Sequence, residues 1–425
     1  MVDPVPWRTA GPLRRNLLIA HLGALDARLR ALGGGLHVAT GDPVALVPEV
    51  ARWVGAREVH LNADVSAYAQ RRDARVAESL GGIAVRSHWG NLVHAPGTVT
   101  AASTGRVQQV FTPFFRAWGA ATRAPWPEPT GRPARLLPPP AGAEPVPAAD
   151  GEPVMPGGED AAAGRLAAWI DHVDGYEERR NTPGDPEGTS HLSADLRFGT
   201  LSPRHVIDAV GTHTPGRAAF VRQLAWRDWY AHLLAGHPAL SRRAMRPEMD
   251  RVAWRHDPAG LAAWAEGRTG YPIVDAGMRE LAATGWMHNR VRMVTASFLT
   301  KDLLVDWRHG EAHFRRHLVD FEVSQNAGNW QWVAGTGPDA SPYFRVFNPV
   351  TQGRRFDPEG DYVRHWVPEL AGLAGASVHA PWELGPLELA AAGITLGEGY
   401  PLPLVQHAAA RDRAVAAYEA ARAGR

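Results

Sequence analysis

A proline- and alanine-rich stretch at residues 117–160 divides the chain into two parts with different sequence patterns. Prolines run together at 138–140 and recur at 145 and 147, and such a composition buries too little apolar area to fold by itself. The stretch is also long for a loop inside one compact domain. We therefore expect a first domain at 1–116, a linker at 117–160 and a second domain at 161–425.

The first domain alternates helical and extended patterns. Apolar residues spaced about 3.6 positions apart predict helices at 16–32, 44–53 and 68–80. Short segments that contain apolar and β-branched residues predict strands at 36–39 (LHVA), 58–61 (EVHL) and 83–85 (IAV). This alternation is typical of a parallel sheet with helices on both faces. The glycines at 33–35 end the first helix and do not form a GxGxxG nucleotide motif.

The second domain has a helical pattern throughout, and strand signals are nearly absent. Apolar periodicity predicts helices at 161–178, 203–211, 217–236, 273–285, 290–306 and 411–423. The predicted fold class is thus an N-terminal α/β domain, Rossmann-like with a parallel sheet, followed by a large all-α domain.

Composition excludes several classes of protein. The chain has no cysteine, which rules out disulfides, iron–sulfur clusters and thiolate metal sites. Histidine spacing gives no zinc motif, so no metal is expected. No apolar run approaches the roughly 18 residues of a membrane span, and no signal peptide precedes the first helix, so we expect a cytoplasmic protein. The net charge of +1 does not by itself indicate a nucleic-acid partner.

Two polar motifs could bind an anion or an aromatic ligand. In the first, 187–193 (EGTSHLS), hydroxyls stand beside a glycine where a helix could start, which suits a phosphate but equally suits a plain capped turn. In the second, Gln223, Trp226, Arg227 and Tyr230 share one helical face. If that face is a binding platform, Leu224, Ala225, Asp228 and other positions must make the contact with the core. The alternative is that the face is an aromatic stripe of the core.

Two further motifs concentrate hydrogen-bonding side chains. Within 285–293, Asn289, Arg290 and Met293 can face one way while Arg292 points elsewhere and needs a partner. The segment 320–332 is dense in polar groups and ends in two tryptophans. Ten of the 16 tryptophans lie from Trp226 onward, which is more than a core needs and indicates stacking on a ligand or electron transfer.

These motifs, together with 226–230 (WRDWY), 269–276 (TGYPIVDA), 285–290 (GWMHNR) and 329–332 (NWQW), resemble the photolyase/cryptochrome family, most closely class I cyclobutane pyrimidine dimer photolyases. The resemblance runs from about residue 16 to the C-terminus. It implies an α/β antenna domain and a helical domain that holds FAD and binds DNA. It also implies light-driven repair of pyrimidine dimers by electron transfer from excited reduced FAD to a flipped-out dimer.

The resemblance assigns cofactor-binding positions residue by residue. Asn326 matches the residue beside flavin N5, and Asp320 and Glu322 match contacts to the flavin edge and sugar, with Arg292 pairing to Asp320. The complete cofactor set implied is Tyr176, Thr189, Ser190, His191, Leu192, Ser193, Arg292, Asp320, Phe321, Glu322 and Asn326. His191 stands where relatives often carry arginine.

The resemblance also assigns DNA-facing positions. Trp226 and Trp332 match the tryptophans that sandwich the flipped dimer. Asn289 and Met293 stand where (6-4) photolyases carry histidines, and neither residue can transfer a proton. The remaining positions implied around the lesion and its phosphates are Arg180, Gln223, Arg227, Tyr230, Arg290 and Arg345. Trp254, Trp307 and Trp330 match the family's electron-transfer chain to the flavin.

Departures from the family pattern lead to three expectations. Gln223 replaces a usual glutamate, which predicts reduced but not abolished repair. The chain begins at the family's first helix, so about two sheet strands should be missing or the start misassigned. Tyr68 and Ala69 replace the asparagine and glutamate of folate-binding relatives, which disfavours a folate antenna and leaves a deazaflavin or no antenna.

The leading hypothesis is therefore a monomeric dimer photolyase that acts on damaged DNA in the cytoplasm and joins the nucleoid when DNA-bound. A cryptochrome-type blue-light photoreceptor with weak or no repair is the alternative, and Gln223 keeps it open. A tryptophan- and arginine-rich single-strand binding module is a third reading, which leaves the polar cluster at 320–326 unexplained.

Overall fold

The computed structural model describes residues 2–125, 135–140, 143–339, 342 and 345–424. By its internal contacts the chain divides into two compact units, each built from separate segments. Unit 1 comprises Met1–Asp174, Ser190–Pro238 and Val319–Gln325, and unit 2 comprises Gly175–Thr189, Ala239–Leu318 and Asn326–Arg425. The domain boundaries expected from the sequence stay a prediction, and residues 126–134 and 141–142 of the expected linker lie outside the described residues.

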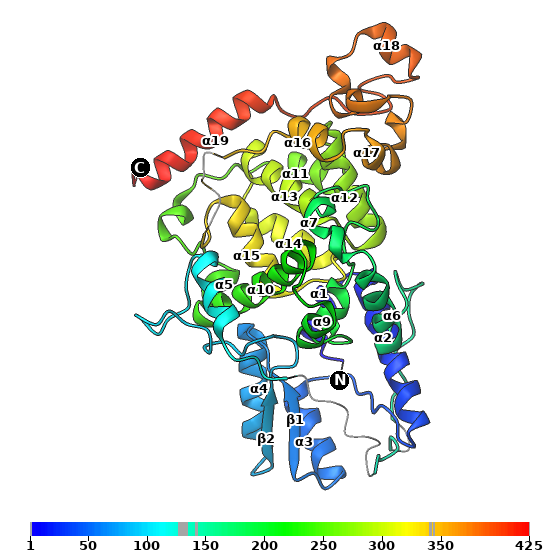
Figure 1. Cartoon of the computed structure of the whole chain (residues 1–425), viewed down its shortest axis with the longest axis vertical. Coiled ribbons are helices and arrows are strands. Elements are labelled where there is room, and N and C mark those ends of the chain that lie inside the picture. The colour runs from blue at the N-terminus through cyan, green and yellow to red at the C-terminus, as the bar shows by residue number, and fades with distance from the viewer. Residues whose placement is uncertain (1, 126–134, 141–142, 340–341, 343–344, 425) are drawn as a thin grey trace. The chain divides into compact units, whose positions relative to one another are not determined.

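Unit 1 contains the described sheet and a set of helices (Figure 1). Side chains of Asp42, Ser66, Ser202 and Thr214 accept hydrogen bonds in the first turns of α3, α4, α9 and α10, which fixes where these helices begin. Its elements are α1 (Pro4–Thr9), α2 (Pro12–Ala31), α3 (Pro43–Trp53), β1 (Glu58–Asn62), α4 (Ala67–Ser79), β2 (Ala84–His88), α5 (Phe111–Ala120), α6 (Glu159–Ile170), α8 (Ser193–Phe198), α9 (Pro203–Val210) and α10 (Pro215–Gly236).

Strands β1 and β2 pair in parallel, with Val59 opposite Val85. Both valines pack against an apolar cluster supplied by α3 and α4, which cover one face of this sheet. Alternate residues of β1, Glu58, His60 and Asn62, are exposed, because successive side chains of a strand point to opposite faces. Helices therefore cover the valine face of these two strands, whereas the described side chains on the other face of β1 are exposed.

The strand predicted at 36–39 is wrong as a regular element. Within the described residues, this segment and its neighbour make only isolated bridges, between Val38 and Glu144 and between Val2 and Thr40. Three of the four residues at 36–39 are apolar, which indicates burial, and Val38 is buried, but this pattern does not secure a partner strand. The other two predicted strands correspond to β1 and β2, and the predicted helices to α2, α3 and α4.

Unit 2 is helical among its described residues. Its last helix, α19, packs Ala414 and Tyr418 against Met249, Val252 and Leu304 in one apolar cluster. The α-helices are α7 (Tyr176–Arg179), α11 (Pro258–Ala265), α12 (Pro272–Thr284), α13 (Asn289–Ser297), α14 (Trp307–His317), α15 (Val323–Ala334, whose first three residues belong to unit 1), α16 (Pro349–Phe356), α17 (Asp361–Trp366), α18 (Pro386–Ala391) and α19 (His407–Arg422). The expected fold class, an α/β part plus a large helical part, is confirmed.

Two predicted helices are interrupted. The helix expected at 161–178 ends at Ile170 in α6 and resumes at α7 after a short 3-10 turn. The helix expected at 290–306 is α13 followed by a π-helical turn, Phe298–Asp302, and Leu304 has a φ of 54°. The apolar spacing continues through both interruptions, and for this reason periodicity alone predicts one continuous helix in each case.

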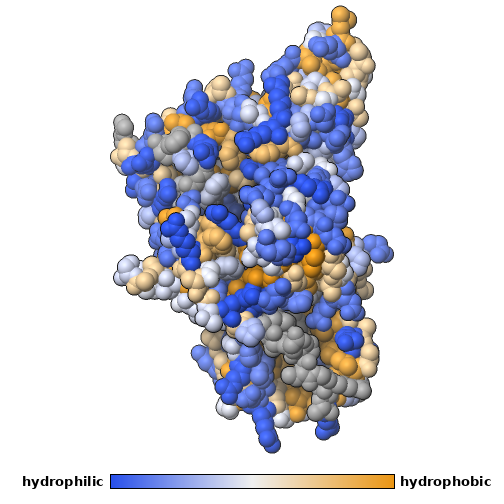
Figure 2. Space-filling model, viewed as in Figure 1, coloured by the Kyte–Doolittle hydropathy of each residue, from blue (hydrophilic) through white to orange (hydrophobic). Residues whose placement is uncertain are grey.

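The exterior carries the expected mixture of side chains. Figure 2 shows polar residues over much of the viewed face, with apolar residues in small groups. Apolar residues gather around α18, where Leu387 is 87% exposed. Some exposed apolar surface of this kind is normal on folded proteins.

Lys301, the only lysine of the chain, lies in the interior of unit 2. Its side chain is 1% exposed, its Nζ donates to the carbonyl oxygen of Ala334 at 3.0 Å, and it lies 3.6 Å from the ring centroid of Tyr418. Burial lowers the pKa of the Lys301 amine to about 7. The π-helical turn that carries it therefore buries a side chain that usually faces water.

Asp228 is the buried centre of α10. Its carboxylate accepts hydrogen bonds from the backbone N–H groups of Val93 and His94 and from Trp118 Nε1, which lies 2.9 Å away. Burial raises the pKa of the Asp228 carboxyl to about 6, and the donated hydrogen bonds oppose that rise. Because each of these partners is a donor, the group is suited to accept only, and it ties the loop at 91–94 and α5 to α10.

We expect the substitution Asp228→Asn to lower the free energy of unfolding by about 2 kcal/mol, because the new amide N–H would face buried donors and leave at least one unsatisfied. Urea denaturation of the variant and the parent measures this difference. Asp171→Asn, at an exposed position, is the matched control and should stay within about 0.5 kcal/mol of the parent. Equal losses in the two variants would contradict the assignment.

Candidate functional site

The segment 190–193 of unit 1 forms an irregular entry to α8. His191 has a φ of 52°, which is unusual for a residue other than glycine, and the N-cap residue Leu192 offers no side-chain hydrogen bond. Ser193 is the first helical residue, and its Oγ is buried without a hydrogen-bond partner among the described residues. A helix start without a side-chain cap, beside a buried hydroxyl without a partner, suits a phosphate group.

Arg227 occupies an interior position that differs from the expected DNA-facing one. Its side chain is 11% exposed, and it pairs with Glu322 at 2.8 Å and donates to the carbonyl oxygens of Asn91 and Leu196. The residue thus joins α10, the loop at Asn91 and the segment before α15 within unit 1. This geometry does not favour a lesion contact by Arg227, and it gives Glu322 a protein partner that the sequence did not reveal.

The aromatic face predicted on α10 is divided in the structure. Trp226 is half-buried and stacks on Phe111 of α5, with ring centroids 3.7 Å apart and planes at 12°. Only its opposite face can therefore receive a further ring. Tyr230 is 2% exposed and packs in the core, and its expected position at the lesion stays a prediction. Gln223 turns its Nε2 back to the carbonyl oxygen of Ala219 at 3.2 Å.

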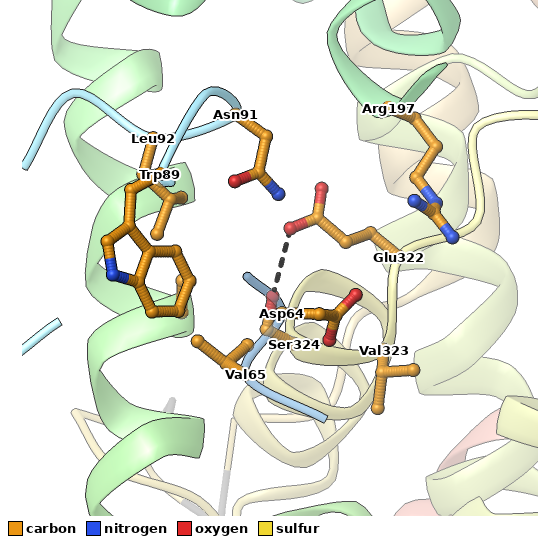
Figure 3. Close-up of a pocket in the computed structure, with 10 residues that line it drawn as sticks. Asp64, Val65, Trp89, Asn91, Leu92, Arg197, Glu322, Val323 and Ser324 are labelled. Carbon is orange, nitrogen blue, oxygen red and sulfur yellow. Dashed lines mark hydrogen bonds between the residues drawn. The ribbon is translucent and has the colours of Figure 1, made fainter. Parts of the chain in front are cut away.

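A small polar cavity adjoins Glu322 in unit 1 (Figure 3). Its volume of about 20 Å³ is enough for a water molecule and far too small for a chromophore. Ser324 Oγ donates to Glu322 Oε1 at 3.3 Å, and the buried Oδ1 of Asn91 has no partner among the described residues. The cavity is lined by Asp64, Val65, Trp89, Asn91, Leu92, Arg197, Ala231, Glu322, Val323 and Ser324.

In unit 2, Glu311 fixes the orientation of Asn326. The amide Nδ2 of Asn326 donates to the backbone oxygen of Glu311 at 3.0 Å and to its Oε1 at 2.9 Å. Because both partners are acceptors, the nitrogen must face Glu311, and the carbonyl Oδ1 of Asn326 is directed elsewhere as an acceptor. Arg315 pairs with Glu311 one turn later on α14. Glu311 is not among the residues predicted from the sequence.

The tryptophans of the expected electron-transfer chain all lie in unit 2. Trp330 is 2% exposed and Trp307 1% exposed, whereas Trp254 is half-buried and contacts Tyr418 edge-on. The ring of Trp330 packs edge-on against Phe314, at 5.0 Å, and against Trp264, at 6.1 Å. Burial thus decreases from Trp330 and Trp307 to Trp254, as a path from the interior to the surface requires.

Helix α14 positions Trp330 through a glycine. A Cβ atom on Gly310 would lie 2.7 Å from Leu299 and still closer to the ring carbons of Trp330. Trp307, Gly310, Glu311 and Phe314 are the buried residues of α14, spaced i, i+3, i+4 and i+7 on one helical face. That spacing is the signal that could have found Gly310 and Glu311 in the sequence.

The motif on α13 has the predicted geometry. Asn289 Nδ2 and Arg290 Nη1 both approach Met293 Sδ, at 3.9 and 4.0 Å, whereas Arg292 Nε donates to the carbonyl oxygen of Met287. Arg290 also donates to Asn181 Oδ1 at 2.8 Å. One face of α13 therefore presents an amide, a cation and a thioether together.

The remaining predicted residues are placed as follows. Burial raises the pKa of the Tyr176 hydroxyl to about 12. Thr189, Ser190, Asp320, Phe321, Arg180 and Trp332 are half-buried, and Arg345 is exposed. The pairing of Arg292 with Asp320 and the roles assigned to all these positions stay predictions. Across the described ranges, no group of three or more histidine or acidic side chains is arranged to hold a metal, and no helix is both long and apolar enough to cross a membrane.

Comparison with protein families gives two matches. Residues 1–130 match the model described as DNA photolyase, and residues 220–420 match the FAD binding domain of DNA photolyase. Curated relatives include the deoxyribodipyrimidine photo-lyases of Escherichia coli, 39% identical over 100% of this chain and 93% of that protein, and of Streptomyces griseus, 45% identical over 92% and 86%.

Solved structures agree with these matches. A class III photolyase from Agrobacterium tumefaciens superposes with a TM-score of 0.89 at 39% identity and covers 97% of this chain and 89% of its own. A cryptochrome from Synechocystis sp. PCC6803 has a TM-score of 0.88 at 29% identity, covering 98% and 92%. The folds are therefore alike over nearly the whole chain.

The cofactor of this chain is FAD, because the matched domain is a FAD binding domain. The residues present fit it: the buried, unpartnered Ser193 hydroxyl at an uncapped helix start suits a phosphate, and Asn326 offers an oriented acceptor oxygen. The chain belongs to the DNA photolyase family and is an enzyme that uses FAD.

Proposed function

We propose that the protein splits cyclobutane pyrimidine dimers in DNA under blue light. The proposal rests on the relatives named deoxyribodipyrimidine photo-lyase and on the residue types at the predicted site. When bound and reduced, FAD supplies the electron that opens the cyclobutane ring. The protein then has to bind the DNA, receive the dimer, exclude water and orient the cofactor.

One observation favours the cyclobutane dimer as substrate over the (6-4) photoproduct. The α13 face that carries Arg290 presents Asn289 and Met293, whose contacts are hydrogen bonds to sulfur at 3.9 and 4.0 Å. Neither side chain can donate or accept a proton for catalysis. Splitting a cyclobutane ring by electron transfer does not need such a group, whereas repair of a (6-4) photoproduct requires proton transfer.

The remaining roles follow from the positions of individual residues. Ser190 and Ser193 would hold phosphate oxygens of the cofactor, and Asn326 would offer its carbonyl oxygen to a ring N–H. The free face of Trp226, and Trp332, would each stack on a base of the extruded dimer. Trp330, Trp307 and Trp254 would return electrons to the cofactor from the surface. Glu311 acts through Asn326, whose orientation it fixes.

The decisive experiment is repair of an oligonucleotide that contains one thymine dimer, under blue light and in the dark, beside an oligonucleotide with one (6-4) photoproduct. We expect light-dependent loss of the first lesion only. A protein that contains FAD and repairs neither lesion would instead support the photoreceptor alternative, which the fold shared with a cryptochrome keeps in view.

Gln223→Glu tests the main departure from the family pattern. A glutamate could share a proton with the reduced dimer, whereas the Gln223 amide offers only a hydrogen bond, and in the structure it bonds to Ala219. We expect dimers repaired per absorbed photon to rise by about twofold, the effect of one modest hydrogen bond. An unchanged quantum yield with unchanged DNA affinity would refute this role for Gln223.

We also infer that no folate antenna is bound. Tyr68 donates its hydroxyl to both carboxylate oxygens of Asp3, at 2.9 and 2.7 Å, and burial raises the pKa of that hydroxyl to about 12. Ala69 is buried and has no polar atom to offer. Chromophores released by denaturation and separated by chromatography would distinguish a deazaflavin from FAD alone. We propose further that the enzyme is a cytoplasmic monomer that joins the nucleoid on damaged DNA, which gel filtration and microscopy can test.

A further inference from the structure

Three arginines of unit 2 lie near one another without an acidic partner. Arg180, Arg290 and Arg355 form no ion pair with any described residue, and the Nε atoms of Arg180 and Arg290 are buried without a hydrogen-bond partner there. Burial, followed by the nearby charges of Arg355 and Arg180, lowers the pKa of the Arg290 guanidinium. Arg290 is therefore repelled by the positive charges of both Arg355 and Arg180.

The arginines next in sequence to Arg180 and Arg355 do form ion pairs, so the lack of an acidic partner is specific to certain positions. Arg179 pairs with both oxygens of Asp185, each at 2.6 Å, and Arg354 pairs with Glu383 at 2.8 Å. Each lies next in sequence to a member of the unpaired set. The chain therefore compensates the adjacent charges and leaves those of Arg180 and Arg355 uncompensated.

Arg290 is held in place by neutral groups alone. Its Nη2 donates to Asn181 Oδ1 at 2.8 Å, its guanidinium lies 4.3 Å from the ring centroid of Phe356, and its Nη1 approaches Met293 Sδ. These contacts orient the planar guanidinium and remove none of its net charge. A carboxylate in place of the Asn181 amide would orient it equally well and would also neutralise it.

Holding a half-buried cation without a counter-charge costs free energy, and binding of an anion offsets that cost. In a protein that acts on DNA, that anion is the phosphodiester backbone, which guanidinium groups recognise in bidentate fashion. Resting on the proposed function, we infer that Asn181 is a positioning residue that keeps Arg290 oriented yet uncompensated, and that Arg355 is a further phosphate-binding residue of the same anion site.

Dark binding of a dimer-containing duplex, measured from low to physiological salt, tests both parts. Asn181→Asp should neutralise Arg290 and reduce the slope of log affinity against log salt by about 0.9, the value of one phosphate contact. Asn181→Ala should keep the parental slope and lose up to about tenfold in affinity at one salt concentration, because only the orienting hydrogen bond is gone. Both variants should retain bound FAD, judged by the flavin absorption spectrum.

Arg355 has a matched control in its neighbour. Arg355→Ala should reduce the salt slope by about one contact, whereas Arg354→Ala, which removes a charge already paired with Glu383, should leave the slope unchanged. The inference is overturned if Asn181→Asp keeps the parental slope, if Asn181→Ala loses it, or if the two arginine variants behave alike. These binding measurements use no light. Absence of light-dependent dimer repair would therefore contradict the proposed function without changing the outcome of the binding test.

Discussion

Replacing Trp330 with phenylalanine should abolish most light-driven reduction of the bound flavin while leaving repair by the chemically reduced enzyme nearly intact. Phenylalanine is much harder to oxidise than tryptophan, and adding even about 3 kcal/mol to the barrier of an electron-transfer step slows it on the order of 100-fold. Trp330 is 2% exposed and packs between Phe314 and Trp264, so the smaller ring keeps an apolar environment.

Two measurements separate this effect from damage to the fold. Flavin absorbance followed during illumination with an external reductant gives the rate of photoreduction, and a dimer oligonucleotide mixed with enzyme reduced by dithionite gives repair. Trp169→Phe is the matched control, because Trp169 is equally buried but lies in unit 1, outside the predicted chain of tryptophans. If Trp330→Phe photoreduces at the parental rate, or if Trp169→Phe is equally slow, Trp330 is not the donor.

Gly310→Ala should destabilise the protein by about 3 kcal/mol and also slow photoreduction, because the added methyl group would overlap the Trp330 ring and Leu299. The usual effect of this exchange inside a helix has the opposite sign, since alanine favours a helix by roughly 1 kcal/mol over glycine. Packing against Trp330 therefore outweighs helix propensity at this position.

Gly164 supplies the control for that experiment. It also lies inside a helix, α6, but a Cβ there would meet no atom within 4 Å. Gly164→Ala should raise the free energy of unfolding by up to about 1 kcal/mol and leave the rate of flavin photoreduction unchanged. Denaturant unfolding combined with illuminated absorbance reports both quantities for both variants. A stabilised Gly310→Ala variant would show that the Trp330 ring can move aside without loss.

Local sequence patterns predicted the elements whose formation depends on a few consecutive residues. The apolar periodicity of α2, α3 and α10 and the alternation in β1 are properties of a few consecutive residues, and the structure has all four elements. The strand predicted at 36–39 did not form because a strand needs a partner. Among the described residues, the bridge of this segment joins Val38 to Glu144, which is far along the chain and carries no strand signal. The prediction of one continuous helix at 290–306 was wrong because nothing in the apolar spacing marks the change to a π-helical turn.

The candidate site shows the same limit more sharply. The α13 face could be predicted because Asn289, Arg290 and Met293 lie within one helical turn. The pair Arg227 and Glu322 could not, because 95 positions separate the partners, and without that partner an arginine beside two tryptophans indicated a ligand-binding face. Resemblance to a family identifies positions, but whether an arginine points toward a ligand or toward a carboxylate depends on the tertiary packing of this chain.

Because Lys301 is buried, access of a reagent to this residue reports whether the interior of unit 2 has opened. A lysine-specific protease has one cleavage site in the whole sequence, and in the native state that site is 1% exposed and bonded to Ala334. Cleavage therefore requires the interior of unit 2 to open first, so the amount of cut chain counts molecules that have opened there. Amine-reactive dyes would report the same event at Nζ, and bound FAD or DNA that closes unit 2 would register as protection of a single residue.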